Sequence, residues 1–293
     1  MYIDPYADEK RIPFIVAEIG INHNGDVETA RKMIGMAKDC GADAVKFQKR
    51  TLDIVYSKEF LDSPRQSPWG TTQREQKRGL EFNKDGYDDI DKYCKELGIY
   101  WFASSWDEKS QEFLRHYEVP FNKIASAMLT HKNLVEMIAR EGKHAFISTG
   151  MSKISEIDRV VGIFKKYNCQ FTLMHCVSIY PCPDEWCNVK MVETLKKRYG
   201  CPVGYSGHEN GVGPTTIAVA LEAVAIERHI TLDRSMYGAD QAVSLEKKGL
   251  ELVVRDSREV KKTLGTGEKI MISEEEKIKY KLRYFRDEEF SWD

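Results

Sequence analysis

Short apolar runs alternate along the chain with longer amphipathic segments. The runs rich in β-branched and aromatic residues predict strands at 14–22, 44–48, 100–105, 122–126, 145–150, 171–178, 203–208 and 225–233. Amphipathic helices are predicted between them, at 27–40, 87–97, 107–117, 132–141, 155–167, 189–199 and 213–221, with a last helix at 245–263. The pattern therefore repeats a strand followed by a helix along most of the chain.

This alternation predicts a fold. Eight strands, each followed by a helix, over ~250 residues are typical of a (β/α)8 TIM barrel. A doubly wound open sheet alternates in the same way, but no glycine-rich dinucleotide fingerprint follows the first strand. One interruption, residues 50–83, carries the turn-rich run SPRQSPWGTTQRE and is predicted to be an extended loop after the second strand. The barrel is the favoured architecture.

Composition excludes several classes of protein. The chain has 293 residues, of which 42% are hydrophobic, and its net charge is −2, so overall charge does not favour binding to nucleic acid or to an anionic membrane. No apolar run reaches the ~18 residues of a membrane span, and the N-terminus lacks the apolar stretch of a signal peptide. Seven irregularly spaced cysteines indicate reduced thiols in a cytoplasmic protein; Cys182 and Cys187 are interpreted as packing residues rather than a zinc pair.

Two histidines occupy matching places in adjacent elements. His208 lies in GYSGHENG and His229 in AIERHITLD, each after apolar, strand-forming residues. A strand–helix–strand unit would place both near the carboxyl ends of neighbouring parallel strands, where neutral imidazoles could hold a divalent metal ion. An isolated histidine is more often an ordinary interior or surface residue. The metal hypothesis gains weight because polar residues recur at the same strand ends throughout the chain.

In a TIM barrel the carboxyl ends of the strands carry the catalytic residues. In chain order the polar residues at these ends are Glu18, Asn22, Lys46, Gln48, Ser104, Ser105, Lys123, Ser126, Ser148, Thr149, His175, Ser178, Tyr180, Ser206, His208, Glu227, His229, Asp233 and Arg234. Some polarity is expected there from structure alone, because a strand end is also a boundary with solvent.

Lysines inside apolar strands are more specific. Lys46 lies in AVKFQ and Lys123 in NKIAS, and a buried ammonium group requires a nearby anion. With neighbouring hydroxyl and amide groups, the two lysines would form a cradle for phosphate or for phosphate plus carboxylate. The alternative is internal pairing with Glu18 and Glu227. An anion cradle beside two histidines favours an enzyme that acts on a phosphorylated small molecule.

Several motifs resemble one family. They are AEIGINHNG (17–25), VKFQ (45–48), NKIAS (122–126), ISTGM (147–151), HCVSIYPCP (175–183), GYSGHE (204–209) and ERHITLDRSMYGADQAVSLE (227–246). In this order, and at these strand ends, they are similar to the sialic acid synthase family, the nonulosonate synthases that condense phosphoenolpyruvate with a sugar. The resemblance spans residues 14 to about 250; collectively the motifs are specific, although no single one is.

The resemblance implies a metal-dependent transferase reaction. C3 of phosphoenolpyruvate attacks the aldehyde of an open-chain amino sugar such as N-acetylmannosamine, water adds at C2, and phosphate leaves, which gives a 3-deoxy-2-keto acid. It implies catalytic roles for Glu18, Lys46 and Lys123, and Mn²⁺ or Mg²⁺ held by His208 and His229. It implies substrate binding by Gln48, Ser104, Ser126, Ser148, Tyr180, Ser206 and Asp240. It also implies a homodimer.

The chain departs from the family pattern on the acceptor side. Met128 stands where an acidic residue is usual, and Ser178 stands in a tripeptide that commonly includes asparagine. Residues 66–74 lack the usual sugar-binding asparagine, and 104–107 read SSWD rather than a Thr-Pro-Phe type. Since the phosphoenolpyruvate and metal motifs are intact, we expect an altered acceptor or a different route for the acceptor-side proton transfer. N-acetylmannosamine itself is expected to be a poor substrate.

Domain organisation is the second departure. Residues 1–265 are predicted to form the barrel, and 266–293 a charged segment. Family members typically continue into a small antifreeze-like domain that contributes an arginine to the partner's sugar site; the segment after 265 is too short for a separate domain of ordinary stability.

Three other functions stay open. A synthase that uses a sugar-phosphate acceptor would need a second phosphate cradle, for which Arg50 and the Arg74–Arg78 region are the available basic residues. A metal-dependent hydrolase is disfavoured because the first strand ends in Asn22-His23-Asn24, without paired histidines on one strand. A non-catalytic descendant of the synthase is supported only by Met128 and by the chain length.

Overall fold

Eight parallel strands close into a barrel. The computed structural model describes residues 3–9 and 12–283. The strands are β1 (Phe14–Gly20), β2 (Ala44–Lys49), β5 (Tyr100–Ser105), β6 (Phe121–Ile124), β7 (His144–Ser148), β8 (Phe171–His175), β9 (Val203–Gly207) and β10 (Ala225–His229). They are hydrogen-bonded in the order β1-β10-β9-β8-β7-β6-β5-β2, and the barrel closes between β2 and β1. The predicted (β/α)8 TIM barrel is confirmed.

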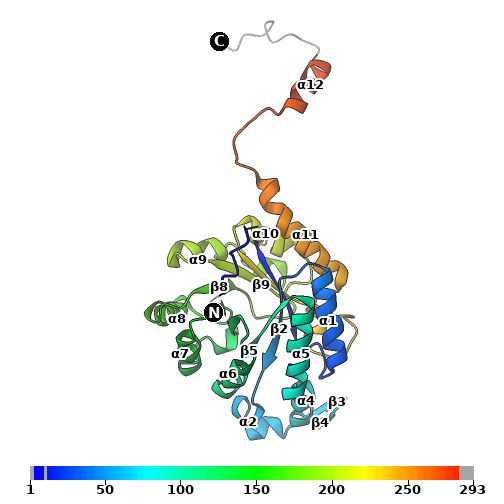
Figure 1. The fold of residues 1–293 in the computed structure, drawn as a ribbon, viewed down its shortest axis with the longest axis vertical. Helices are drawn as coiled ribbons and strands as arrows, with labels where there is room; N and C mark the ends of the chain where they lie inside the picture. The colour runs from blue at the N-terminus through cyan, green and yellow to red at the C-terminus, as the bar shows by residue number, and fades with distance from the viewer. Residues whose placement is uncertain (1–2, 10–11, 284–293) are drawn as a thin grey trace.

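Helices surround the barrel, as Figure 1 shows. They are α1 (Val27–Asp39), α5 (Lys84–Leu97), α6 (Glu108–Leu114), α7 (Lys132–Arg140), α8 (Ile154–Lys166), α9 (Met191–Tyr199), α10 (Gly213–Ala220) and α11 (Lys247–Leu264). Each strand is therefore covered on its outer face by a helical layer and on its inner face by the other strands. This double burial explains why the strands read as nearly continuous apolar runs.

The amino-terminal half of the barrel interior is filled by aromatic rings. Phe14, Phe102, Phe121 and Phe146 are each 2% exposed or less, and their ring centroids lie 5.4–5.9 Å apart. Register pairs Phe102 with Lys46 and Phe146 with Lys123, so the two lysines project from the same inner face as the rings. The barrel is a packed core toward its amino-terminal end, and polar side chains gather at the carboxyl ends of the strands.

The prediction of an extended loop at 50–83 is wrong. This segment contains α2 (Leu52–Val55), α3 (Lys58–Leu61), a hairpin of β3 (Pro64–Ser67) and β4 (Gly70–Thr72), and α4 (Gln73–Leu80). Two local sequence signals explain why this segment forms regular secondary structure. Gly70 has φ +147°, which favours glycine in the hairpin turn, and Thr72 and Glu75 form a capping box that begins α4.

Six strands end one to four residues earlier than the hydrophobic pattern predicts, and the difference is largest for two of them. The strand predicted at 171–178 ends at His175, and the one predicted at 225–233 ends at His229. After His229 the chain leaves the sheet: the N–H of Thr231 donates to Leu245 O, and the N–H of Leu245 donates to His229 O. Apolar residues continue past these ends because the first loop residues are still buried over the barrel.

The charged segment predicted at 266–293 is described as far as residue 283; residues 284–293 lie outside the described residues. Helix α12 (Ser273–Leu282) lies apart from the barrel (Figure 1). The domain boundary at 265 stays a prediction.

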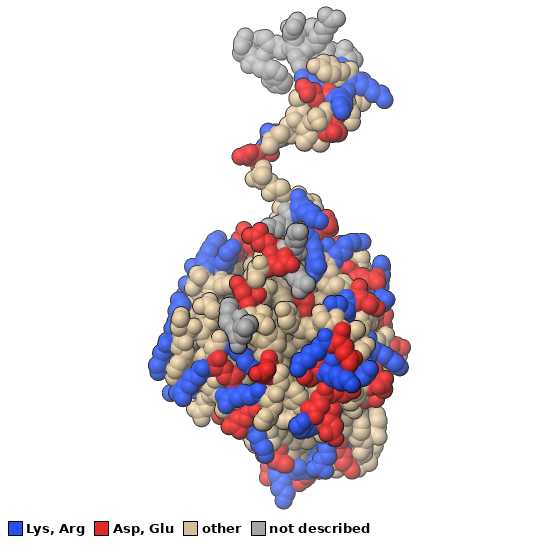
Figure 2. Space-filling model, viewed as in Figure 1, with Lys and Arg blue, Asp and Glu red and all other residues tan. Residues whose placement is uncertain are grey.

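Charged side chains of both signs are intermingled over the face of the barrel in Figure 2. Among the described residues, no helix combines the length and apolar character needed to cross a membrane.

Candidate active site

A cavity of about 230 Å³ opens at the carboxyl ends of the strands. The predicted site residues that line it are Glu18, Lys46, Gln48, Ser104, Lys123, Ser126, Ser148, Tyr180, Ser206, His208 and His229. Asp240 is not among the lining residues, but its carboxylate lies 4.0 Å from His229 Nδ1. Side chains from all eight strands or their following loops therefore meet at one mouth of the barrel.

Two lysines and two glutamates form a buried cluster at the base of this cavity. Lys46 Nζ lies 2.8 Å from Glu18 Oε2 and 3.7 Å from Glu227 Oε1. Lys123 Nζ lies 3.9 Å from the same Glu227 oxygen. The lysine side chains are only 3% and 2% exposed. The internal pairing left open by the sequence is thus present, and it is formed inside the cavity rather than away from it.

Burial and charge shift the pKa values of this cluster. Burial raises the pKa of Glu18 to about 7, against the opposing effect of Lys46 and with a further rise from Glu227. Burial alone would also raise the pKa of Glu227, but Lys123 and Lys46 outweigh it and lower that pKa below its usual value. Glu18 is therefore the carboxyl group that can gain and lose a proton near neutral pH.

Hydroxyl groups extend the cluster around the barrel. Lys46 donates to Ser104 Oγ at 2.9 Å, and Lys123 donates to Ser148 Oγ. Ser206 donates to Glu227 Oε1 at 3.2 Å. These serines lie on three strands, so an anion bound between the lysines would meet donors from several directions. That arrangement suits a phosphate or carboxylate group.

Gly150, just after β7, lets a further hydroxyl group reach the cavity. Its N–H donates to Ser126 Oγ at 3.1 Å. A Cβ at this position would lie 2.3 Å from Ser178 Oγ and 2.8 Å from Ser126 Oγ. A larger residue would therefore displace both serines, and glycine is required here because the two side chains approach the backbone closely.

His208 and His229 are neighbours at the cavity wall. Their ring centroids lie 5.6 Å apart. His208 Nδ1 donates to Val177 O at 2.7 Å, which leaves Nε2 with a free lone pair. Burial lowers the pKa of His208 to about 4, with a further contribution from His229, and burial also lowers the pKa of His229. Both rings are neutral at neutral pH, as metal ligands must be.

The histidine pair fits a divalent metal ion. His229 Nδ1 is buried without a hydrogen-bond partner, so one nitrogen of this ring has an unsatisfied position. Within residues 3–9 and 12–283, no group of three or more His, Cys, Asp or Glu side chains is arranged to hold a metal. A metal here would have two protein ligands, with its other positions taken by water or substrate.

Several lining residues were not among the predicted site residues. Glu227 entered the sequence reasoning as a strand-end residue and a lysine partner, without a role in the site, although both buried lysines approach it. Trp106 and Cys176 also line the cavity, and Trp106 Nε1 is buried without a partner. One sequence signal could have indicated that Trp106 lines the cavity, namely its position two residues after Ser104, at the end of the third barrel strand. An apolar side chain at a strand end indicates packing as readily as a site, so the sequence did not select it.

Met128 does not face the acceptor side as expected. It is partly buried and packs against the hydrophobic core, whereas Ala127 lines the cavity. Residues 126–128 form a single 3-10 turn just after β6. Ser178 does line the cavity. Met128 therefore brings no apolar side chain into the cavity, and an altered acceptor side stays a prediction.

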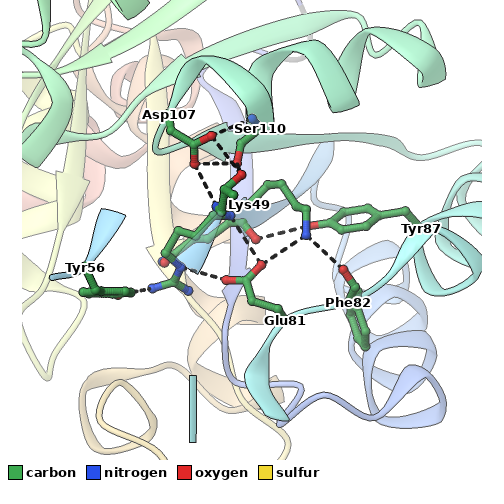
Figure 3. A network of polar contacts seen from close by, with 10 residues as sticks. Lys49, Tyr56, Glu81, Phe82, Tyr87, Asp107 and Ser110 are labelled. Carbon is green, nitrogen blue, oxygen red and sulfur yellow. Dashed lines mark hydrogen bonds and ion pairs between the residues drawn. The ribbon is translucent and has the colours of Figure 1, made fainter. Parts of the chain in front are cut away.

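A second network fixes the chain just beyond β2 (Figure 3). Glu81 lies between Lys49 and Arg50 and accepts from both, at 3.4 Å and 2.9 Å. Asp107 accepts from the N–H and the hydroxyl of Thr51 at 2.8 Å and 2.9 Å. The Arg50 guanidinium also lies 5.2 Å above the Trp106 ring. The first turn of segment 50–83 is thus tied to the wall of the active-site cavity.

A larger cavity of about 510 Å³ lies among residues of α7 and α8. Its lining combines apolar residues such as Val135 and Ile163 with charged residues such as Arg159 and Glu156. It contains no histidine and none of the buried charged groups described above. The cavity at the strand ends is therefore the better candidate for catalysis.

Known proteins match most of the chain. The human N-acetylneuraminate-9-phosphate synthase is 41% identical over 262 residues, which are 88% of this chain and 73% of the human protein. The N,N'-diacetyllegionaminic acid synthase of Legionella pneumophila is 34% identical over 87% of this chain and 74% of its own length. The crystal structure of the N-acetylneuraminic acid synthetase of Leptospira borgpetersenii superposes with a TM-score of 0.82 at 33% identity, covering 93% of this chain and 92% of that one.

The family assignment follows from these matches. The model of the NeuB family matches residues 33–269, which include most barrel strands and both histidines. The resemblance found in the strand-end motifs is thereby confirmed. Its motifs coincide with the residues that line the cavity. The chain belongs to the NeuB family.

Proposed function

We propose that the protein condenses phosphoenolpyruvate with an open-chain amino sugar similar to N-acetylmannosamine. The products would be a 3-deoxy-2-keto nonulosonic acid and inorganic phosphate. The observation that carries this proposal is the joint placement of two buried lysines and two neutral histidines around one cavity. The names of the relatives support it, since the human and Legionella proteins are synthases of such sugar acids.

Phosphoenolpyruvate would bind at the base of the cavity. Its phosphate and carboxylate would replace Glu18 and Glu227 as partners of Lys46 and Lys123, with Ser126, Ser148 and Ser206 as further donors. Fixing both anionic ends orients C3 toward the histidine side, where the acceptor would lie. Donors already held by the strands need no reorganisation when phosphate begins to leave.

Glu18 would handle the proton on the acceptor side. When C3 forms the new bond to the aldehyde carbon, the aldehyde oxygen becomes an alkoxide and takes a proton. Glu18, with its pKa of about 7, can supply that proton and recover one from the water that adds at C2. Gln48 donates to Glu18 Oε1 at 3.2 Å and would keep the carboxyl group directed into the cavity.

His208 and His229 would hold Mn²⁺ or Mg²⁺. Such an ion supplies Lewis-acid polarisation of a carbonyl oxygen. Tyr180 packs against His208 with ring centroids 4.1 Å apart, so it would cover the acceptor and limit its orientation. Asp240, beside His229, would accept hydrogen bonds from sugar hydroxyls.

A phosphate-release assay tests the proposal. The protein is incubated with phosphoenolpyruvate and Mn²⁺ across a panel of amino sugars, and release is expected only when an acceptor aldehyde is present. Release at the same rate without any sugar would indicate a hydrolase. Binding of phosphoenolpyruvate without release for any sugar would indicate a non-catalytic descendant. Either result would contradict the proposal.

A phosphorylated acceptor is a second candidate, which a neighbouring cavity favours. This cavity of about 350 Å³ is lined by six cationic residues, one acidic residue, Asp53, and several neutral side chains. The cations are Lys49, Arg50, Arg74, Arg78, Lys84 and Lys109. Arg50 borders it and also contacts Trp106 of the active-site cavity. The human relative, named for a 9-phosphate product, agrees with this option.

Kinetics with matched sugars would decide between the two acceptors. If the phosphate binds among these cations, Arg78→Ala and Lys109→Ala should raise KM for the 6-phosphate of an amino sugar and leave KM for the free sugar unchanged. Arg50 and Arg74 are poorer choices, because Glu81, Asp53 and Asp62 already pair with them. Equal efficiency with both sugars in the unaltered protein would exclude a phosphate requirement.

A further inference from the structure

A fully buried ion pair lies behind the two histidines, on the outer side of the barrel wall. Glu209 follows His208, and Arg228 precedes His229. Arg228 Nη1 lies 2.9 Å from Glu209 Oε1, and the two side chains are 1% and 0% exposed. Arg228 alternates along β10 with Glu227 and His229, which line the cavity, so it projects from the opposite face of the strand. Glu209, just beyond β9, pairs with it there and does not line the cavity either.

The Arg228 guanidinium also holds the chain that follows β9. Nη2 donates to Glu209 O at 2.6 Å, and Nη1 donates to Gly211 O at 2.9 Å and to Thr215 Oγ1 at 2.8 Å. Arg228 therefore ties β10 to the turn after His208 and to the first turn of α10. One planar group with several fixed donors can hold three such points at once.

Glu209 is held as firmly as its partner. Its Oε1 accepts from Thr215 Oγ1 at 2.7 Å, and its Oε2 accepts from Tyr205 OH at 2.9 Å. The carboxylate occupies the space beside Gly207, where a Cβ would lie 2.4 Å from Glu209 Oε2. The glycine in the Gly-His-Glu run thus makes room for the carboxylate, and this fixes the backbone on both sides of His208.

Stability alone does not explain this arrangement. A buried ion pair is often no more stabilising than a well-packed apolar pair, because both charges lose their hydration. Its geometric effect is specific, however. The pair couples the backbone of one histidine to the backbone of the other, and the two imidazoles must keep a fixed separation to share one metal ion.

We propose that Arg228, through Glu209, is a positioning residue that sets the separation of His208 and His229 for joint binding of a divalent cation. This inference rests on the metal site proposed above. Arg228 does not touch the substrate or the ion. It keeps the two ligands at the spacing observed, with ring centroids 5.6 Å apart, before any ion binds.

The test measures metal and phosphoenolpyruvate affinities separately, by calorimetry on the metal-free full chain. Arg228→Lys keeps the charge but loses the planar fork, and Glu209→Gln keeps the shape but loses the charge. Arg198→Lys is the matched control, because Arg198 pairs with Asp158 at 2.9 Å on the surface. Mn²⁺ affinity should fall about 10- to 100-fold in the first two variants and stay unchanged in the control. Phosphoenolpyruvate affinity without metal should stay unchanged in all three.

Each alternative outcome contradicts the proposal in a recognisable way. Unchanged Mn²⁺ affinity in folded Glu209→Gln would assign the ion pair a structural role only, even if Arg228→Lys fails to fold. A parallel loss of Mn²⁺ and phosphoenolpyruvate affinity would indicate general loosening of the barrel. If the unaltered protein binds phosphoenolpyruvate but no Mn²⁺, the metal site itself is absent, and the positioning role falls with it.

Discussion

The two sides of the active-site cavity are built differently. At the base, Lys46 and Lys123 lie within strands and are 3% and 2% exposed. Toward the opening, Tyr180 and Met151 lie on loops after the strands and are 45% and 69% exposed. The base is held by the hydrogen bonds of the barrel, whereas the opening depends on loops that can change without affecting the sheet. Under the proposed function, the base would bind phosphoenolpyruvate and the opening would select the acceptor.

The largest expected effect lies where the two sides meet. Replacing His208 or His229 with alanine should abolish metal-dependent activity. It should weaken Mn²⁺ binding by more than the ~100-fold that is typical when a residue hydrogen-bonded to a metal ligand is replaced. Chelation should have the same effect on the unaltered protein, and added Mn²⁺ should reverse it. His144 is a buried histidine elsewhere in the barrel, with Nε2 2.9 Å from Thr172 Oγ1. If His144→Ala removes Mn²⁺ binding equally, the effect is one of folding.

The base is tested by removing its charges. Lys46→Met and Lys123→Met should weaken phosphoenolpyruvate binding by ~2–5 kcal/mol, because each removes a cation and leaves Glu227 less compensated. Lys49→Met is the matched control, since Lys49 lies on the same strand as Lys46 but pairs with Glu81 at 3.4 Å. Wild-type affinity in both active-site variants would show that these lysines serve only the internal ion pairs.

The proton held by Glu18 should appear in the stability of the protein. Because its pKa is raised to about 7 in the folded protein, the folded state keeps a proton that the unfolded chain releases near pH 4.5. The free energy of unfolding should therefore fall as pH rises from about 4.5 to about 7, by up to ~3 kcal/mol. Glu18→Gln should lose this component, as measured by urea unfolding at several pH values. A difference between the two proteins that does not vary with pH would contradict the shift.

The smallest effect is expected at the opening. Ser178→Asn should change the discrimination between amino sugars, measured as the ratio of their kcat/KM values, by the equivalent of ~1–3 kcal/mol. The reason is that the new amide group can hydrogen-bond to sugar hydroxyls that the serine does not reach. KM for phosphoenolpyruvate should stay unchanged. In the unaltered protein, N-acetylmannosamine is expected to be a poor acceptor. An efficiency with that sugar of ~10⁴ M⁻¹s⁻¹ or above would show that the acceptor side is ordinary.

The contrast between barrel strands and the loops that follow them also explains which features the sequence could predict. Strands such as 100–105 were predicted with the bounds that the structure has, because buried parallel strands are apolar runs. Most polar residues at the ends of those runs line the cavity, because the carboxyl ends of parallel strands meet at one mouth of the barrel. The strand-end residues that do not line it are Asn22, Ser105, Thr149, His175, Asp233 and Arg234. Segment 50–83 was predicted wrongly, because its order comes from a short hairpin and from ion pairs such as Arg50–Glu81, which leave no hydrophobic period. Met128 packs against the core instead of lining the cavity, and Glu227 is central because lysines from two other strands approach it. Both facts depend on contacts between residues far apart in the sequence.

The most direct test of the proposed condensation follows the carbon of phosphoenolpyruvate. With phosphoenolpyruvate labelled with ¹³C at C3, Mn²⁺ and a preferred amino sugar, carbon NMR should show the vinyl carbon converted to a saturated methylene bonded to the former aldehyde carbon. Phosphate should be released in equal amount. Appearance of the label in the methyl group of pyruvate would show hydrolysis without carbon–carbon bond formation, and would contradict the function proposed for this cavity.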